Sequence, residues 1–201
     1  MELKHIYDIM LRYEERHPEQ KIALSGKLGK NKWNEYTPQQ YKKTANELSC
    51  ALLAKGIRKG DKVALISTNR PEWTITQMAA TQIGAVLVPI YPTITAEDYH
   101  YILQHCEAKL VIMEGEIVMR KVQSVADRLP QLKDIYTFAD RKDYPYWDQL
   151  IALGRENYDE GKLQELRAAN DEKECAMIIY TSGTTGTPKG VMLSTQIHAQ
   201  E

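Results

Sequence analysis

The sequence lacks several features that point to common classes of protein. It carries 26 Lys and Arg against 27 Asp and Glu among 201 residues, so no overall charge favours nucleic acid or an anionic membrane surface. Its three cysteines, Cys50, Cys106 and Cys175, are odd in number and lack metal-ligand spacing. A disulfide framework and a zinc site are therefore disfavoured, and we expect buried free thiols.

Long apolar runs are missing as well. The first twenty residues are charged throughout and contain no continuous apolar segment of the kind found in signal peptides. No other stretch approaches the roughly eighteen apolar residues of a membrane span. The sequence therefore predicts a cytoplasmic protein without a transmembrane segment, and it leaves peripheral membrane contact and oligomeric state undetermined.

The first 37 residues predict a helix and a β-hairpin. Apolar residues at helical spacing indicate an amphipathic helix that ends near Pro18. Two short β-like runs then follow, Lys21–Ser25 and Lys32–Thr37. The stretch between them, Gly26–Asn31, contains two glycines and suits a hairpin loop.

A series of helices and strands is expected next. Thr37 and Pro38 suit the cap and first turn of a helix that runs to Gly56. Thr95 and Asp98 form the pattern of a capping box before a later helix. Strands that alternate with helices of this length predict an α/β fold, with a largely parallel sheet covered by helices on both faces. The expected strands are Val63–Ile66, Ala85–Ile90, Leu110–Met113 and Ile135–Phe138, and the expected helices between them are Pro71–Ile83, one that begins at Thr95, and Glu116–Leu129.

The region from Arg141 to Glu174 is more polar. One short helix is expected near Trp147, followed by a surface connection with some helix around Leu163. Residues 176–180 then indicate a buried strand, and residues 191–193 a returning strand.

The loop between these two strands has the sequence TSGTTGTPKG. Its glycines allow backbone N–H groups to approach an anion closely, and its lysine adds a mobile positive charge. Hydrogen bonds to a charged phosphate are each worth roughly 1.5–3 kcal/mol. The composition therefore predicts a phosphate-binding loop and disfavours a plain surface hairpin. The expected contributors are the glycines Gly183, Gly186 and Gly190, the hydroxyl residues Thr181, Ser182, Thr184, Thr185 and Thr187, and Lys189.

Two familiar phosphate motifs do not match this loop. A Walker A loop has four residues between its first glycine and Gly-Lys, and then Ser or Thr after the lysine. Here Gly183 and Gly186 are three positions apart, and Gly190 follows Lys189. A dinucleotide-binding G-x-G-x-x-G fingerprint opens a helix, whereas a strand is expected here. P-loop ATPase, ordinary kinase and NAD-binding interpretations are therefore disfavoured.

From Tyr180 to Val191 the chain resembles, without a gap, the signature loop of the adenylating superfamily. This superfamily includes acyl-CoA synthetases, firefly luciferase and the adenylation domains of peptide synthetases. Two further stretches, NRPEW at 69–73 and GAVLVPIYPT at 84–93, resemble the AMP-forming acyl-CoA synthetases, and long-chain fatty acid CoA ligases most of all. The order of expected elements is similar over essentially the whole chain.

The resemblance implies an activity and a site. The implied reaction is ATP-dependent activation of a carboxylic acid, most like a long-chain fatty acid, to an acyl-adenylate, followed by thioester formation with CoA. ATP and Mg²⁺ are the implied cofactors, fatty acid and CoA the implied substrates, and no nucleic acid is implied. A threonine hydroxyl, assigned to Thr184, would lie near Mg²⁺. The residues implied to bind phosphate are Thr181, Ser182, Gly183, Thr184, Thr185, Gly186, Thr187 and Lys189.

The same resemblance implies that much of the enzyme lies beyond residue 201. The adenine contacts, the acidic Mg²⁺ ligand, the acyl tunnel, the hinge and the catalytic lysine of the family are all expected downstream. We therefore expect residues 1–201 to be the N-terminal part of an AMP-binding domain, with the C-terminal domain absent, no catalytic residue assigned and no activity alone. Acyl chain length and acceptor are not predicted.

Several alternatives stay open. The chain could be a natural short binding or interaction module without catalysis, or an adenylating enzyme that uses a carrier protein as acceptor. The segment after the loop also departs from the family, which often has Ser-His followed by Asn where this chain has Ser194-Thr195-Gln196.

Histidine and tryptophan give no second site. His100 and His105 lack an acidic partner for a metal set, so packed or solvated side chains are expected. Trp33, Trp73 and Trp147 are expected to fill a core.

Overall fold

A six-stranded sheet forms the centre of the protein, in the order β6-β5-β3-β4-β7-β8. The computed structural model describes residues 3–27, 32–140, 144–181 and 187–196. The paired strands are parallel except β8, which runs antiparallel to β7. The predicted α/β fold with a largely parallel sheet is confirmed. The strands are β3 (Lys62–Ile66), β4 (Val86–Ile90), β5 (Ala108–Met113), β6 (Asp134–Thr137), β7 (Cys175–Thr181) and β8 (Lys189–Ser194).

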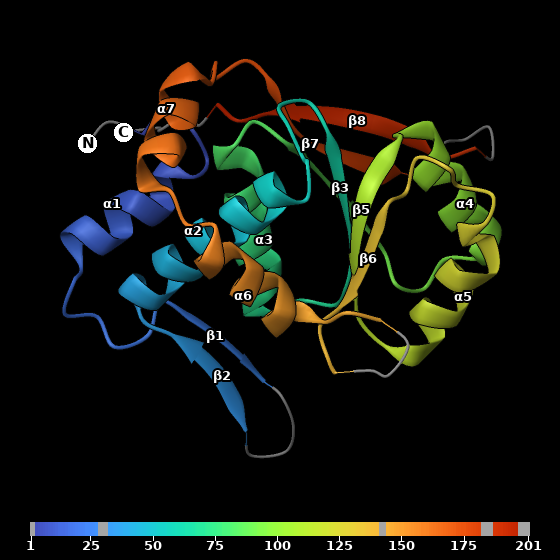
Figure 1. Cartoon of the computed structure of the whole chain (residues 1–201), viewed down its shortest axis with the longest axis horizontal. Helices are drawn as coiled ribbons and strands as arrows, with labels where there is room; N and C mark the ends of the chain where they lie inside the picture. The colour runs from blue at the N-terminus through green and yellow to red at the C-terminus, as the bar shows by residue number, and fades with distance from the viewer. Residues whose placement is uncertain (1–2, 28–31, 141–143, 182–186, 197–201) are drawn as a thin grey trace.

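Helices cover both faces of this sheet (Figure 1). One face carries α1 (Asp8–Arg16), α2 (Pro38–Ala54), α3 (Pro71–Gln82), α6 (Trp147–Glu156) and α7 (Glu160–Ala169). The other carries α4 (Ala96–His105) and α5 (Glu116–Ala126). Helices on both faces are what parallel strands with helical crossovers require, because both faces of the sheet must be buried.

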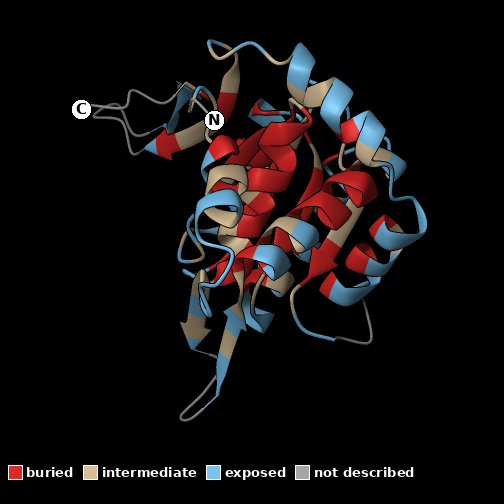
Figure 2. Ribbon diagram, turned by 90° about the vertical axis from the view of Figure 1, so that its left-hand side faces the viewer, coloured by how far each residue is buried: buried red, intermediate tan, exposed pale blue. Residues whose placement is uncertain are grey.

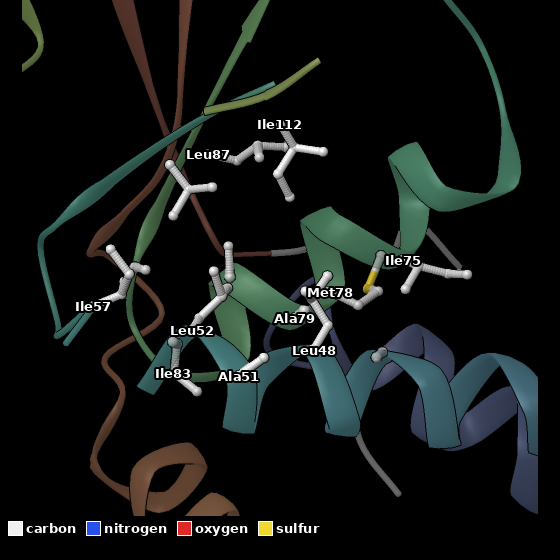
Figure 3. Close-up of a cluster of buried hydrophobic side chains, with 14 of the residues drawn as sticks. Leu48, Ala51, Leu52, Ile57, Ile75, Met78, Ala79, Ile83, Leu87 and Ile112 are labelled. Atoms are coloured by element: carbon white, nitrogen blue, oxygen red, sulfur yellow. The ribbon is translucent and has the colours of Figure 1, made fainter. Parts of the chain in front are cut away.

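Alternation along the strands divides the buried side chains into two cores. In β3, Val63 and Leu65 pack with α2 and α3, whereas Ala64 and Ile66 pack with α4 and α5. Figure 3 shows the first core, in which Leu48 and Leu52 of α2 face α3 and the sheet. The apolar runs of the sequence therefore fill both faces, as expected for a doubly covered sheet.

The two helix starts that carry cap signals are confirmed. The Thr37 hydroxyl accepts a hydrogen bond from the Gln40 amide at 3.2 Å, and the Gln40 side chain accepts one from the Thr37 amide at 2.9 Å. The Thr95 hydroxyl likewise accepts from the Asp98 amide at 3.1 Å. Each pair satisfies N–H groups that a helix cannot satisfy internally.

The hairpin exists, but its first strand is shifted relative to the prediction. β1 spans Leu24–Lys27 and pairs with β2, Trp33–Tyr36, so Gly26 belongs to the strand and not to the predicted loop. A Cβ atom on Gly26 would lie 2.3 Å from Cδ of Pro71. The glycine therefore permits the close approach of the hairpin to α3, and it is not required for a turn.

The polar connection before β7 is more ordered than the sequence suggests. Arg167 of α7 donates to Asn46 at 2.7 Å and to Gln82 at 2.9 and 2.6 Å, and it pairs with Glu160 at 3.1 Å. These bonds join α7 to α2 and α3, so the helix predicted around Leu163 exists, spans Glu160–Ala169 and is fixed to the core instead of forming a loose surface connection. Its partners are far apart in sequence, which hides them from pattern analysis.

Two of the three cysteines follow the prediction of buried free thiols, whereas Cys175 and one tryptophan do not. All three cysteines are free; Cys50 and Cys106 are buried and Cys175 is half-buried. Burial raises the pKa of the Cys106 thiol to about 11. Trp147 is buried and Trp73 packs against the core, but Trp33 is 57% exposed and contradicts the expectation of a core position. It lies on the hairpin, outside both cores.

Candidate functional site

The loop with the phosphate-binding composition joins β7 to β8. Thr181 is the last residue of β7 and Lys189 the first of β8, and the two are paired across the strands. Thr181, Thr187 and Lys189 are all exposed. The predicted residues Ser182, Gly183, Thr184, Thr185 and Gly186 lie outside the described residues. The structure thus brings both ends of the predicted loop together in contact with solvent.

The position of this loop in the sheet is favourable for ligand binding. β7 is parallel to β4, so Thr181 lies at the edge where the parallel strands have their carboxyl ends. Ligands of open α/β sheets bind in the crevice outside these ends. The sequence predicted that a strand leads directly into the loop, whereas the position of the loop at this edge follows from the pairing of β7 with β4.

A cavity of about 490 Å³ opens beside the described ends of the loop. Its walls are largely apolar and come from the turn after β4, from α4 and from the end of β7. The lining residues are Pro89, Ile90, Tyr91, Ile94, Asp98, Ile102, Ile179, Tyr180, Thr181 and Pro188. A cavity of this size next to exposed Thr181 offers room for an organic group beside residues that the sequence predicts to bind phosphate.

Tyr180 connects the loop to α4. Its hydroxyl lies 2.6 Å from Nδ1 of His105, whose ring also stacks on Tyr101 with 5.4 Å between centroids. Burial raises the pKa of Tyr180 to about 12, so the phenol keeps its proton at neutral pH. His105 is exposed, and its ring is hydrogen-bonded to Tyr180 and stacked on Tyr101. Among the described residues no group of three potential metal-ligating side chains gathers.

Gly190 has a packing role in addition to the one considered from sequence. It lies in β8 opposite Tyr180. A Cβ atom on Gly190 would lie 2.9 Å from Cγ2 of Ile178 and 3.3 Å from Cζ of Tyr180. The absence of a side chain thus lets the Tyr180 ring lie under β8 near the start of the loop.

A polar cluster around Arg70 and Glu114 lies at the same edge of the sheet, and the sequence analysis did not predict it. The Glu114 carboxylate accepts hydrogen bonds from Ser67 at 3.0 Å and from the Thr68 hydroxyl at 2.7 Å, and pairs with Arg70 at 2.9 Å. Arg70 also pairs with buried Glu72 at 2.8 Å, and its guanidinium lies 4.1 Å from the centroid of the Phe138 ring. A cavity of about 260 Å³ opens beside Arg70 and Glu114. The two carboxylates already pair with Arg70, which makes this cluster a support for the sheet edge.

The Glu114 contacts predict an acid-sensitive contribution to stability. Burial disfavours the charged carboxyl, but hydrogen bonds from Thr68 and the charge of Arg70 outweigh burial and lower the Glu114 pKa below its ordinary value of 4.5. A carboxyl with a lower pKa in the folded state stabilises the fold above the unfolded pKa, and this stabilisation is lost as pH falls through the folded pKa. We expect Glu114→Gln to be less stable than the parent at pH 7, with the difference shrinking by pH 3, in urea unfolding. Exposed Glu165→Gln is the control and should change little at either pH; equal losses for Glu114→Gln at both pH values would contradict the assignment.

Comparison with known proteins gives a consistent family match. Residues 11–200 match the family model described as AMP-binding enzyme. A long-chain-fatty-acid–CoA ligase of Xenopus laevis is 33% identical over 178 residues, which cover 86% of this chain and 24% of that protein. The chain thus spans about a quarter of the length of the curated relatives it matches.

Solved structures agree in fold. An anthranilate CoA ligase, determined in complex with anthranoyl-AMP, is 25% identical with a TM-score of 0.77, and the match covers 97% of this chain and 34% of that protein. A fatty acyl CoA synthetase of Mycobacterium tuberculosis is 27% identical with a TM-score of 0.71, and the match covers 95% of this chain and 34% of that protein.

Proposed function

We propose a function from one premise, that the chain belongs to the AMP-binding enzyme family. The full protein would use ATP to activate a carboxylic acid. A carboxylate oxygen attacks the α-phosphorus. The bond between the α-phosphorus and the oxygen that links it to the β-phosphate breaks, and acyl-adenylate and pyrophosphate form. The CoA thiol then loses its proton and displaces AMP to give the thioester. A long-chain fatty acid is the proposed acid, supported by the name of a relative that is 33% identical.

The observation that carries this proposal is the pairing of Thr181 with Lys189 at the carboxyl edge of the sheet. Two anions, carboxylate and triphosphate, must approach each other, and charge grows on the leaving pyrophosphate. Hydrogen-bond donors and the Lys189 cation at the loop would offset this repulsion. The cavity beside Thr181 gives an organic substrate room next to those donors.

The remaining assignments belong to the same proposal. Ser182, Gly183, Thr184, Thr185, Gly186 and Thr187 would join Thr181 and Lys189 around the β- and γ-phosphates. Mg²⁺ is bound in such sites largely through substrate phosphates and water, and the Thr184 hydroxyl would supply an oxygen donor of the type that it prefers. Residues 1–201 would form the N-terminal part of the AMP-binding domain, and the predicted cytoplasmic location stays a prediction.

The proposal is tested by assaying the full protein that contains this sequence. We expect pyrophosphate release that depends on ATP and on added palmitate, followed by CoA thioester formation. Acetate and benzoate serve as comparisons for the class of acid. Pyrophosphate release with acetate or benzoate and not with palmitate would replace the proposed long-chain acid with a short or aromatic one. No pyrophosphate release with any carboxylate would contradict the proposed function.

A further inference from the structure

The β1–β2 hairpin has two unlike faces. Burial alternates along both strands, with Leu24, Gly26, Asn34 and Tyr36 on the more buried face. This face is attached to α3, because Asn34 and Tyr36 donate to the buried Glu72 carboxylate and Gly26 packs on Pro71. The hairpin is therefore fixed to the body by one face, and its other face is exposed.

An aromatic ring and a lysine occupy the outer end of the exposed face. Trp33 is 57% exposed and pairs directly across the hairpin with exposed Lys27. Lys32, next to Trp33, is exposed as well. Nearer the base, Ser25 donates to Glu35 at 3.5 Å. The residues Lys27, Lys32 and Trp33 are called the hairpin patch below.

The charge of this segment differs from that of the rest of the chain. Residues 24–36, from the start of β1 to the end of β2, contain three lysines and one acidic residue, Glu35, and so carry a net charge of +2. Because the whole chain carries a net charge of −1, the remaining residues carry −3. Positive charge is therefore concentrated on the hairpin, and none of its described lysines forms an ion pair with another described residue.

The hairpin also projects from the molecule. Figure 1 shows β1 and β2 extending away from the sheet and helices, and Figure 2 shows the same projection after a turn of 90°, with its strands coloured as intermediate and exposed. A projecting element reaches a flat surface before the body does. The negative remainder of the chain would be kept away from an anionic surface while the hairpin contacts it.

We propose that the hairpin patch docks on an anionic phospholipid surface. Tryptophan favours the boundary between water and lipid because its ring is apolar and its N–H remains hydrogen-bonded. Lysines near an anionic leaflet add attraction that salt screens. A lipid surface is favoured over nucleic acid because exposed Ile22, at 41% exposure beside Lys21, adds apolar surface that a phosphate backbone does not match. The proposal does not depend on the proposed catalytic function, since its test measures no activity.

The test is co-sedimentation of the chain with phosphatidylcholine vesicles that contain or lack phosphatidylglycerol. We expect binding to the anionic vesicles alone, weakened by 0.5 M salt. Reversing Lys27 and Lys32 to Glu should lower the partition coefficient by about tenfold or more. The matched control is Lys133→Glu with Lys173→Glu, which changes the net charge equally at exposed sites elsewhere and should retain most of the binding. A brominated lipid in the vesicles should quench the tryptophan fluorescence of the parent chain, and it should not quench that of the Trp33→Tyr variant.

Several outcomes would overturn the proposal. These are equal binding to neutral vesicles, an equal loss in the control double variant, and binding of single-stranded oligonucleotide with no binding of vesicles. Vesicle binding by the chain but not by the full protein would also overturn it, because another part of the protein would then cover the patch. Thermal unfolding of each variant checks that the fold is intact, as expected for exposed positions.

Discussion

Lys189→Ala in the full protein is expected to lower kcat/KM for ATP by about 10- to 100-fold, measured as fatty acid-dependent pyrophosphate release. A hydrogen bond to a charged phosphate is worth about 1.5–3 kcal/mol, and this range corresponds to that loss in rate. Lys189 is exposed at the first position of β8 and paired with Thr181, so the substitution removes charge without emptying a core.

Two companion variants make this result specific. Lys189→Arg keeps the positive charge and should retain more activity than Lys189→Ala, although its geometry differs. Lys162→Ala removes an exposed lysine that pairs with Glu165 at 2.8 Å on α7, and should leave activity unchanged. Activity of Lys189→Ala within twofold of the parent would show that this lysine does not contact the phosphates.

Gly154→Ala is expected to destabilise the fold by about 1–3 kcal/mol, and Gly154→Val by more. A Cβ atom on Gly154 would lie 1.8 Å from the Glu47 carbonyl oxygen and 2.6 Å from its carbonyl carbon. Both are backbone atoms of α2, so the clash cannot be relieved by the movement of a side chain. The α2 and α6 helices must therefore move apart. The gain in helix propensity on replacing glycine, about 1 kcal/mol, is too small to offset this.

The chain contains a matched control for this effect. Gly161 lies in α7, and its added Cβ would meet only the Asp159 carboxylate oxygen, at 3.4 Å. Gly161→Ala should therefore leave stability unchanged or raise it by up to about 1 kcal/mol. Urea unfolding of the two variants measures both effects. Equal stability of Gly154→Ala and Gly161→Ala would contradict the close contact between α2 and α6.

Local patterns predicted much of the fold. The cap residues Thr37 and Thr95 mark helix starts through bonds that span three residues, so a short stretch of sequence contains both partners. Apolar runs such as 63–66 become strands because a doubly covered sheet buries both faces of each strand. The loop predicted to bind phosphate could be placed between two strands because apolar runs precede and follow it.

Contacts between distant residues could not be predicted in the same way. Nothing near Gly154 in sequence indicates that it touches Glu47, and Arg167 bonds to Asn46 from 121 positions away. The partners of Arg70 and Tyr180, Glu114 and His105, are also supplied by the packing of other elements. The shifted hairpin strand has the same origin, because Gly26 is required by Pro71 of α3 and not by its neighbours in sequence.

Phosphate binding by the loop between β7 and β8 is tested by titrating the isotope-labelled chain with Mg·ATP and following the backbone amide chemical shifts. We expect shifts at millimolar nucleotide that concentrate between Thr181 and Lys189. Inorganic triphosphate should move the same amides. Shifts confined to Arg70 and Glu114, or no shifts at all, would show that this loop does not bind the phosphates.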